Sequence, residues 1–409
     1  MNNTKTFSIK DIASGIYDGP HATPPDSTDG PIFLSIDNVT DEGRLDLSEV
    51  KHISERDFPR WIKRVTPKKD DVVFSYEATL HKYAILPEGF HGCLGRRMAL
   101  VRPNQEKVFP RFLHYYFLSR KWRSIIEANI ISGATVNRIP IKKFPYFKVN
   151  IPALVSQKNI VDLVAPYDDL IDTNRRRIKL LEESARLLYR EWFVYFKFPN
   201  HEKVKIVDSV PEGWKTSVVK DCISFISRGP SLDYISDGED DGIPVLNQRC
   251  IRSGEIELDS VEYAKELSLR QQDLYLKEFD ILINSMGEGT LGRVSRNLSI
   301  HYAMIIHNCI TVVRVNENII NQTILFYRLS AAQTYLETMG LGSTGQTSLK
   351  KEVIERIKIL IPPKELREQF DSIVKPIWLE VGSLKIQNQK LAQARDLLLP
   401  RLMSGAIEV

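Results

Sequence analysis

Residues 160–192 read IVDLVAPYDDLIDTNRRRIKLLEESARLLYREW, and about 210 residues later residues 370–402 read FDSIVKPIWLEVGSLKIQNQKLAQARDLLLPRL. In both segments mostly apolar side chains recur every seventh residue, with a second set four residues after the first. The first segment has Ile160, Tyr167, Asn174, Leu181 and Leu188, together with Val164, Ile171, Ile178, Ala185 and Trp192. The second has Phe370, Ile377, Leu384, Leu391 and Leu398, together with Val374, Val381, Asn388, Arg395 and Leu402. This spacing predicts two long helices, each with one narrow apolar stripe that forms a seam with a partner helix.

The segments around the two helices repeat as well. Ile151-Pro152 aligns with Ile361-Pro362, and Pro166 aligns with Pro376 inside both patterns, where the prolines kink the helices or set their effective first turns. The repeat is far too long for a solenoid and indicates duplication of a whole domain followed by a helix. The predicted parts are a first domain at 1–154, a first helix at 155–197, a second domain with its entry linker at 198–362, and a second helix with the C-terminal tail at 363–409.

Each domain mixes short β-branched runs with helices, which predicts an α+β fold. In the first domain the expected strands are 32–36, 72–75 and 98–102, and a helix is expected near 110–129. That helix is rich in aromatic residues at helical spacing, and we predict that they form core rather than platforms for stacked bases. The residues are Phe112, Tyr115, Tyr116, Phe117 and Trp122.

Charge is unevenly distributed along the chain. Residues 1–154 carry 23 Lys and Arg against 17 Asp and Glu, whereas residues 203–360 carry 18 against 21. The segment 51–69 gathers seven bases around Phe58 and Trp61, a composition that suits phosphate contact, although a solvated surface segment is the alternative. The four cysteines show no CxxC spacing, which favours reduced thiols in a cytosolic protein. No signal pattern and no apolar run near the ~18 residues that span a bilayer is present in the sequence.

Catalytic motifs are missing from the sequence. It has no GxxxxGK[ST] loop, no amino-methyltransferase motif of the form [DNS]PP[YFW], and no HExxH among its eight histidines. Gly287, Gly289 and Gly292 match GxGxxG, but the residues after them predict a strand where a dinucleotide site requires a helix. We therefore expect a protein that is not an enzyme and holds no metal or cofactor. Two alternatives stay open, a single-chain nuclease with two DNA-binding halves and a coiled-coil scaffold without a nucleic acid partner.

Four segments carry a resemblance to a known family. Residues 397–409, LLLPRLMSGAIEV, look like the end of the specificity (S) subunits of type I restriction-modification systems, and residues 187–193, LLYREWF, resemble the end of that family's central helix. Residues 211–214, PEGW, resemble the entry to its second target-recognition domain, and residues 343–350, STGQTSLK, resemble its Gly/Thr-rich loop. The first domain departs from the family, because it lacks a PEGW-type entry and its matching loop reads GATVNRI.

The resemblance implies a non-catalytic, sequence-specific subunit that binds double-stranded DNA in the cytoplasm. Two similar mixed α/β target-recognition domains would each read one half of a bipartite site, and the two long helices would form an antiparallel coiled coil that sets the spacer. The implied partners are DNA, two methyltransferase (modification) subunits that bring S-adenosylmethionine, and restriction/translocase subunits in the full complex, with no membrane.

Base edges in the major groove are read mainly by polar and cationic side chains, and glycines let the backbone approach the duplex. Four loops suit this role, and an ordinary surface turn is the alternative for each of their members. The candidates in the first domain are Tyr76, Glu77, Thr79, His81, Lys82, Asn137 and Arg138. Those in the second are Ser285, Glu288, Thr290, Arg293, Thr344, Gln346 and Thr347.

Each apolar stripe holds an asparagine near its middle, Asn174 in the first and Asn388 in the second. In an antiparallel pair with a pseudo-two-fold axis, residues at the helix middles meet near that axis. We therefore predict that Asn174 and Asn388 hydrogen-bond in the seam, directly or through water, and fix the register at some cost in stability. The alternative is that one or both side chains turn to solvent.

Overall fold

The computed structural model describes residues 4–132, 136–235, 242–252, 255–256, 258, 261–265, 269–287, 289–298, 303–340 and 348–407. The chain divides into two compact units. The first unit combines Met1–Asp172 with Gln389–Val409, and the second unit is Thr173–Asn388. Each unit therefore holds one α/β domain and part of each long helix.

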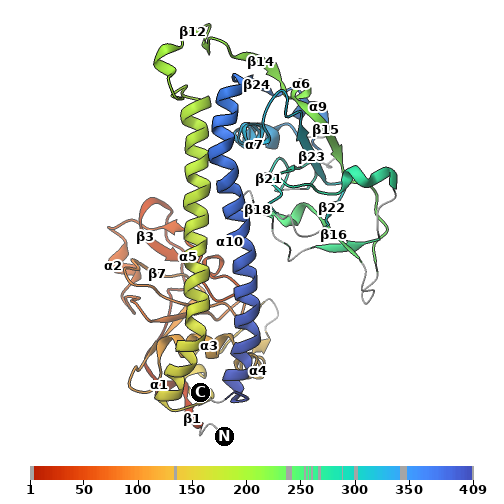
Figure 1. The fold of residues 1–409 in the computed structure, drawn as a ribbon. Helices are drawn as coiled ribbons and strands as arrows, with labels where there is room; N and C mark the ends of the chain where they lie inside the picture. Colours follow the sequence, from red (N-terminus) through yellow and green to blue (C-terminus); the bar gives the residue numbers. More distant parts are fainter. Residues whose placement is uncertain are drawn as a thin grey trace. The chain divides into compact units, whose positions relative to one another are not determined.

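The two predicted long helices are α5 (Leu154–Phe193) and α10 (Lys364–Ser404), which pack antiparallel (Figure 1). In the first unit, Ile160 near the start of α5 shares a core with Leu402 near the end of α10. In the second unit, Trp192 near the end of α5 packs against Phe370 near the start of α10. Helix α5 ends at Phe193, four residues before the end of the predicted segment 155–197, and α10 ends at Ser404, inside the predicted segment of second helix and C-terminal tail at 363–409. Pro166 and Pro376 lie well inside the helices with exposed rings, so neither sets a first turn.

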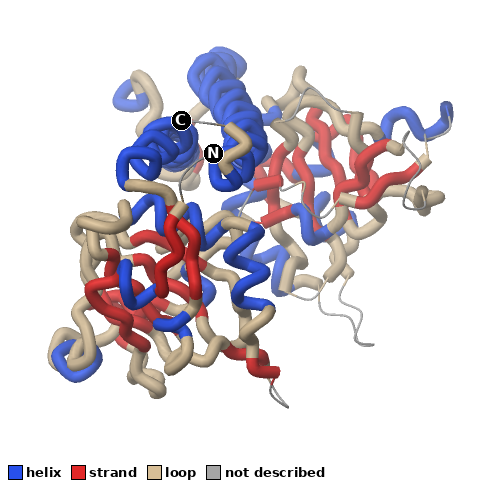
Figure 2. The backbone as a smooth tube through the Cα atoms, turned by 90° about the horizontal axis from the view of Figure 1, so that it is seen from below, coloured by secondary structure: helices blue, strands red, loops and turns tan. Residues whose placement is uncertain are grey.

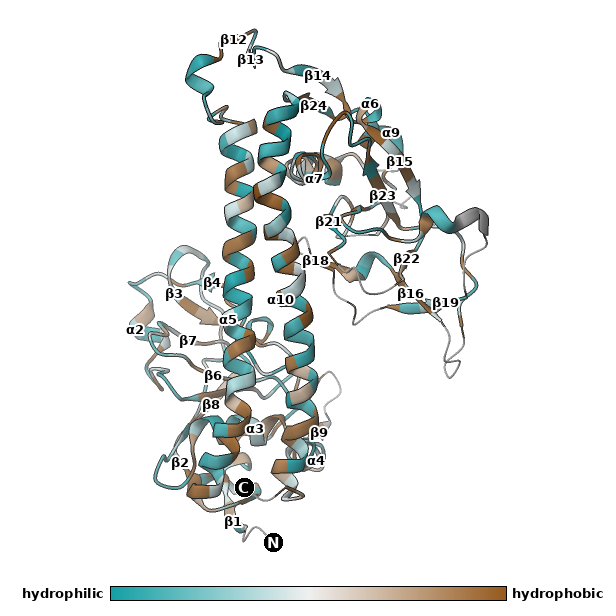
Figure 3. Cartoon of the chain, viewed as in Figure 1, coloured by the Kyte–Doolittle hydropathy of each residue, from teal (hydrophilic) through white to brown (hydrophobic). Residues whose placement is uncertain are grey.

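The predicted seam is confirmed along both helices. Every position of the two stripes is buried or half-buried, and apolar residues recur along α5 and α10 in Figure 3. In the second unit Ile178, Val381 and Leu384 form one such apolar layer.

The predicted asparagine contact is also confirmed. Asn174 is only 4% exposed, and its Nδ2 donates to Asn388 Oδ1 at 2.9 Å. The same amide donates to Gln387 Oε1 at 2.9 Å, so a second acceptor from α10 completes the polar layer. Direct bonding within the seam rules out the alternative in which Asn174 turns to solvent.

Among its described residues, the first unit contains a four-stranded sheet of order β2-β8-β5-β6 and a smaller sheet of order β4-β3-β7. Strands are drawn in red in Figure 2. A third pair, β1-β11, joins the start of the domain to the strand before α5. The strands are β1 (Lys5–Ser8), β2 (Ala13–Asp18), β3 (Ser27–Leu34), β4 (Lys51–His52), β5 (Val72–Ser75), β6 (Tyr83–Ile85), β7 (Gly92–Leu94), β8 (Met98–Pro103) and β11 (Lys148–Ile151), with short helices α1 (Ile9–Ile12) and α2 (Phe58–Trp61). The three strands predicted in this domain correspond to β3, β5 and β8.

The second unit repeats this topology among its own described residues. The sheet orders are β15-β23-β20-β21 and β19-β16-β22, and β14-β24 closes the domain. The elements are β14 (Lys215–Val218), α6 (Val219–Cys222), β15 (Ile223–Arg228), β16 (Ile243–Leu246), β19 (Glu262–Ala264), β20 (Ile281–Asn284), β21 (Val294–Arg296), β22 (Ile305–Ile306), β23 (Ile310–Val315), α7 (Gln322–Ala331), α8 (Gln333–Thr338), α9 (Lys351–Glu355) and β24 (Lys358–Ile361). Even the irregularities recur, since the pairings β2·β8 and β15·β23 shift register at the same place. The predicted duplication of a domain plus a helix is therefore present in the fold.

One ion pair repeats inside both large sheets. Arg102 of β8 donates two hydrogen bonds of 2.8 Å to the Asp71 carboxylate. Arg314 of β23 donates two of 2.6 and 2.7 Å to the Asp280 carboxylate. The carboxylates are almost fully buried, at 1% and 2% exposed, and the paired hydrogen bonds from each arginine compensate for the water that burial removes.

The aromatic helix of the first domain is divided in two. Helix α3 (Pro110–Leu118) ends and α4 (Arg120–Glu127) begins at Ser119, whose hydroxyl caps the second helix by accepting from the Trp122 amide. A single helix from 110 to 129 was therefore wrong, because serine at this position forms a favourable N-cap. The five aromatic residues are 0–2% exposed, which confirms that they form core.

Candidate nucleic-acid interface

In the first unit, three loop segments meet at the end of the large sheet where β5 ends and β8 begins. The Tyr76 amide donates to the Arg97 carbonyl at 3.1 Å, and the Ile139 amide donates to the Tyr76 carbonyl at 2.7 Å. The Ala78 amide donates to the Asn137 carbonyl at 3.1 Å. The structure thus brings together the two loops predicted to contact DNA, and we call residues 76–82, 95–97 and 137–139 the first loop cluster.

The second unit builds the same junction from its own loops. The Ser285 amide donates to the Cys309 carbonyl at 2.7 Å, and the Leu349 amide donates to the Ser285 carbonyl at 2.8 Å. Met286 and Ser348 form an isolated antiparallel bridge beside these bonds. We call residues 285–287, 289–293, 307–309 and 348–349 the second loop cluster. Four predicted contacts lie outside the described residues, namely Glu288, Thr344, Gln346 and Thr347.

The exposed side chains of the first loop cluster are suited to DNA. Thr79, Asn137 and Arg138 are exposed, and so is Arg96, which the sequence reasoning missed. Arginine and asparagine can each make paired hydrogen bonds to a base edge, and an arginine can instead neutralise a phosphate. Three of the seven residues predicted in this domain therefore face solvent at one site.

Tyr76 and Ser285 point inward instead. Tyr76 is 4% exposed, its hydroxyl donates to the Arg96 carbonyl at 3.1 Å, and burial raises the pKa of this hydroxyl to about 12. Ser285 is fully buried with its Oγ 2.5 Å from Thr311 Oγ1. Both side chains support the loops from below, and we correct their predicted role from base contact to support.

The remaining predicted residues of the first loop cluster are half-buried. Glu77 Oε1 lies 3.4 Å from Arg97 Nε, and Lys82 Nζ lies 2.8 Å from an Asp41 carboxylate oxygen. His81 adopts a left-handed backbone with φ of 65°, and its side chain is 17% exposed. Burial, aided by the charge of Arg123, lowers the pKa of His81, which keeps its ring neutral near pH 7.

The glycine motif of the second unit forms a tight turn. Gly287 and Gly292 have φ values of 110° and 78°, and a Cβ on Gly292 would lie 2.6 Å from the Glu337 amide nitrogen. Thr290 Oγ1 donates to the Gly287 carbonyl at 3.3 Å. Arg293 donates to the carbonyls of Gly289 at 2.9 Å and Ile251 at 3.2 Å, so its guanidinium braces the turn. Strand β21 follows directly, as predicted, where a dinucleotide site would need a helix.

Two further residues reach the second loop cluster without any signal in the sequence. Gln248 follows β16, and its Oε1 accepts from Cys309 Sγ at 2.9 Å. The Nδ1 of His307 lies 3.0 Å from the same sulfur, and both side chains are half-buried. They arrive through strand pairings between β16 and β22, which are remote in sequence and which periodicity does not reveal.

In the segment 51–69, the basic side chains and Trp61 differ in exposure. Arg56, Arg60, Lys63 and Lys68 are exposed and available for phosphate contact. Trp61, in contrast, is 8% exposed and packs edge-on against Phe33 in the core, so it is not a stacking platform. The bases of this segment therefore fit an electrostatic role.

Among the residues that the structure describes, no group of His, Cys, Asp or Glu is arranged to hold a metal ion. The four cysteines are buried, and burial raises the pKa of Cys93 to about 12 and that of Cys309 to about 11. No helix of the described chain is long and apolar enough to cross a membrane.

Comparison with known proteins agrees with this geometry. Residues 4–183 and 211–379 match the model of the type I restriction modification DNA specificity domain. The chain is 23% identical to the type I restriction enzyme MjaIX specificity subunit of Methanocaldococcus jannaschii, over all of this chain and 90% of that protein. It is 22% identical to the HindI specificity subunit of Haemophilus influenzae, with full coverage of both. The crystal structure of the S subunit from M. genitalium has the same fold, with a TM-score of 0.55 and 15% identity over 98% of this chain and 96% of that one.

The duplicated domains, their paired helices and the family match define a DNA specificity protein without a catalytic role, and the chain belongs to the type I restriction modification DNA specificity domain family. It is the specificity subunit of a type I restriction-modification system, as the sequence resemblance indicated.

Proposed function

We propose that each recognition domain reads one half of an asymmetric, bipartite target in duplex DNA through its loop cluster, and that the helix pair sets the spacer between the halves. The observation that carries this proposal is the repetition of one loop junction with different side chains. Glu77 and Arg138 form the bridge of the first cluster, where Met286 and Ser348 form the equivalent bridge of the second. Two readers of equal architecture and unequal chemistry fit two different half-sites.

The support for DNA contact is chemical. The first loop cluster exposes Thr79, Arg96, Asn137 and Arg138 on short, braced loops. Exposed arginines and lysines of residues 51–69 add cations in the same domain, which favour phosphate contact. We assign base reading to the loop cluster and register-fixing phosphate contacts to the basic segment.

The outer surface of the helices supports the docking of two methyltransferase subunits. Leu163, Leu170, Leu180 and Leu187 on α5 are 40–70% exposed, although a solvated helix normally carries polar residues on that side. Leu379 and Leu397 on α10 are 49% and 70% exposed. The methyltransferase subunits would bring S-adenosylmethionine, and restriction/translocase subunits would join the full complex. Acting on the cell's DNA, the assembly would work in the cytoplasm.

The test is an exchange of the first recognition domain. Residues 1–154 are replaced by the corresponding domain of another family member, and the methylated sequence is determined in a host that carries the matching methyltransferase. We expect one half of the target to change while the other half and the spacer stay the same. The matched control replaces residues 198–362 and changes the opposite half. A target that changes in both halves, or in neither, contradicts independent reading.

A further inference from the structure

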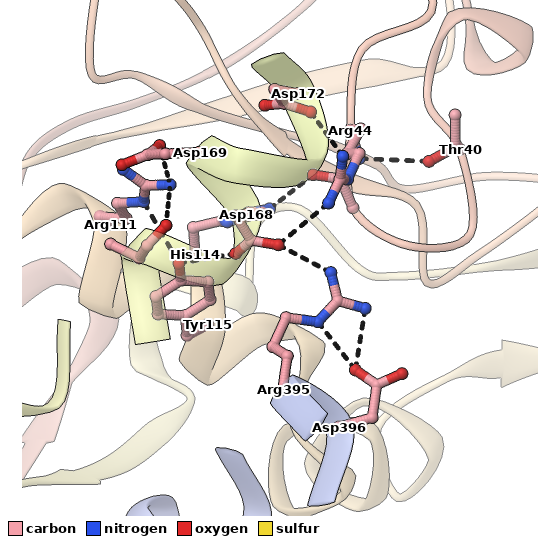
Figure 4. Close-up of polar contacts among 12 residues, drawn as sticks. Thr40, Arg44, Arg111, His114, Tyr115, Asp168, Asp169, Asp172, Arg395 and Asp396 are labelled. Carbon is pink, nitrogen blue, oxygen red and sulfur yellow. Dashed lines mark hydrogen bonds and ion pairs between the residues drawn. The ribbon is translucent and has the colours of Figure 1, made fainter. Parts of the chain in front are cut away.

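Asp168 on α5 is the meeting point of three donors from three different elements of the first unit (Figure 4). Its Oδ1 lies 3.0 Å from Arg44 Nη2 and 2.7 Å from Arg395 Nη1, and its Oδ2 accepts from the Tyr115 hydroxyl at 2.7 Å. Arg44 lies in the loop between β3 and β4, Tyr115 belongs to α3, and Arg395 belongs to α10. We call these four residues the Asp168 cluster.

The Asp168 cluster is shielded from water. The side chains of Asp168, Arg44 and Arg395 are 14%, 13% and 10% exposed, and Tyr115 is 1% exposed. Burial by itself would raise the pKa of Asp168. Hydrogen bonds from Arg395 and Tyr115, with the charges of both arginines, outweigh burial and hold this pKa below its ordinary value. The carboxylate is therefore ionised and fully engaged.

The loop that carries Arg44 is fixed to the same helices. Arg44 also pairs with Asp172 at 2.5 Å, one turn further along α5. The carbonyl of Gly43 accepts from the buried His114 ring of α3 at 2.8 Å. Gly43 has φ of 83°, which L side chains rarely adopt, and a Cβ there would lie 2.6 Å from Leu118 Cδ1, so a substitution would strain the backbone and displace the Leu118 side chain. Residues 40–44 are thus held on α3 within the recognition domain and, through Arg44, on α5 of the helix pair.

The second unit has an equivalent contact between its recognition domain and the helices, but different residue types form it. Trp378 takes the place of Asp168 in the repeat, and its Nε1 donates to the hydroxyl of Tyr327, the counterpart of Tyr115, at 3.1 Å. The guanidinium of Arg296 lies 4.4 Å from the Trp378 ring and pairs with Glu182 of α5 at 2.6 Å. The counterpart of Arg395 is the fully buried Ala185. The tyrosine contact is retained, but carboxylate and arginine are replaced by an indole and a methyl group.

We propose that Asp168 is a positioning residue for DNA recognition, which holds the first recognition domain in one orientation on the helix pair and so determines which spacer the subunit accepts. This inference rests on the proposed function, because orientation matters only if two halves of a target are read at a fixed separation. The ionic joint of the first unit and the aromatic joint of the second also make the two domains non-interchangeable. A domain placed on Asp168 and Arg395 must supply the counterparts of Arg44 and Tyr115, or it leaves buried charge without full compensation.

The experiment uses the chain assembled with its methyltransferase subunits and duplexes that carry the target with its natural spacer or with one base pair more or less. Asp168→Asn keeps the shape of the side chain and removes the charge that the two arginines need. We expect the preference for the natural spacer to fall by about 2- to 30-fold, the range by which residues in coupled networks alter energetic coupling. Discrimination among half-site sequences should stay the same, and Asp168→Glu should restore part of the spacer preference.

The matched control is Asp162→Asn on the same helix, where the carboxylate is 56% exposed and pairs with its helical neighbour Lys158. It should leave the spacer preference unchanged. Since Asp168→Asn could impair folding, Arg44→Gln is measured as well, because it frees the loop and leaves the helix contacts of Asp168 in place. Amide hydrogen exchange of residues 40–44 should accelerate in both variants and not in the control.

The outcomes separate the two proposals. If Asp168→Asn and Arg44→Gln lower methylation of all spacers equally, Asp168 has only a structural role and the inference is overturned. An unchanged spacer preference in both variants overturns it as well. A wild-type complex that accepts every spacer equally overturns the proposed function first, and the inference with it.

Discussion

The polar layer of Asn174, Gln387 and Asn388 offers the sharpest test of how the helix pair sets the spacer between the two half-sites. Asn174 donates to both α10 acceptors at 2.9 Å, within a seam whose neighbouring positions are apolar. We predict that Asn174→Leu combined with Asn388→Leu keeps or raises thermal stability and broadens the accepted spacer. Both effects follow from exchanging a directional contact for a non-directional one.

The magnitudes can be worked from the structure. Asn174→Leu alone leaves the half-buried Asn388 amide without its partner, which should cost about 1–3 kcal/mol. In the double variant no amide remains in the seam, since Gln387 is exposed and can turn to water. Burial of the introduced leucine adds about 1–2 kcal/mol to the free energy of unfolding. A slide of one heptad moves one helix about 10 Å along the other at 1.5 Å per residue. That corresponds to about three base pairs at 3.4 Å per base pair.

The assay combines thermal unfolding of wild type, the single variant and the double variant with methylation of a library of targets whose spacers differ in length. The single variant should melt below wild type, and the double variant at or above it. Spacers about three base pairs away from the natural one should become accepted only in the double variant. An unchanged spacer distribution would refute the register role even though the contact exists, and a double variant less stable than Asn174→Leu alone would refute the energetic reasoning.

Other predictions concern single residues. Burial lowers the pKa of His114 from 6.5 to about 4, so the folded chain holds the imidazole neutral. The stability that the neutral ring contributes is present above pH 6.5 and is lost as the pH falls toward 4, by up to a few kcal/mol. His114→Gln should therefore make the melting temperature less dependent on pH between pH 7 and 5. Arg138→Ala should cost about 1–3 kcal/mol for one half-site alone if it contacts a base, whereas Arg96→Ala should weaken binding of all sequences and reduce the salt slope by about 1 if it contacts phosphate. Arg296→Met should destabilise the second unit by about 2 kcal/mol or more in urea unfolding, because it leaves Glu182 without its partner and removes a buried cation from two aromatic rings.

The long helices, the duplication and the seam could be predicted because they depend on local periodicity. A heptad pattern states which residues of a helix share a face, and the burial of the two stripes follows from it. The same holds for the aromatic residues of α3 and α4, since amphipathic spacing identifies the side that packs. The break at Ser119 was missed because serine is compatible with a helix interior and becomes a cap only when the chain turns there.

The loop clusters could be predicted only in part. The sequence identified the right segments, because glycines and polar residues follow predicted strands, but not the direction of each side chain. Tyr76 and Ser285 come directly after β5 and β20, where one residue of shift exchanges the inward and outward faces. Arg96, Gln248 and His307 reach the clusters through pairings between remote strands, and a single sequence contains no local signal for such pairings.

Two polar residues in the α10 seam show what a periodic pattern leaves open. Asn388 and Arg395 occupy equivalent kinds of position, one heptad apart, and by pattern alone both weaken an apolar stripe. Their partners give them different tasks. Asn388 accepts from Asn174 across the seam and fixes the helices to each other, whereas Arg395 pairs with Asp168, which lies outside the stripe and also holds Arg44 of the recognition domain. Asn388 thus constrains the register of the two helices, whereas Arg395 constrains the orientation of the recognition domain on them. We therefore expect helix register and domain orientation to respond to separate substitutions.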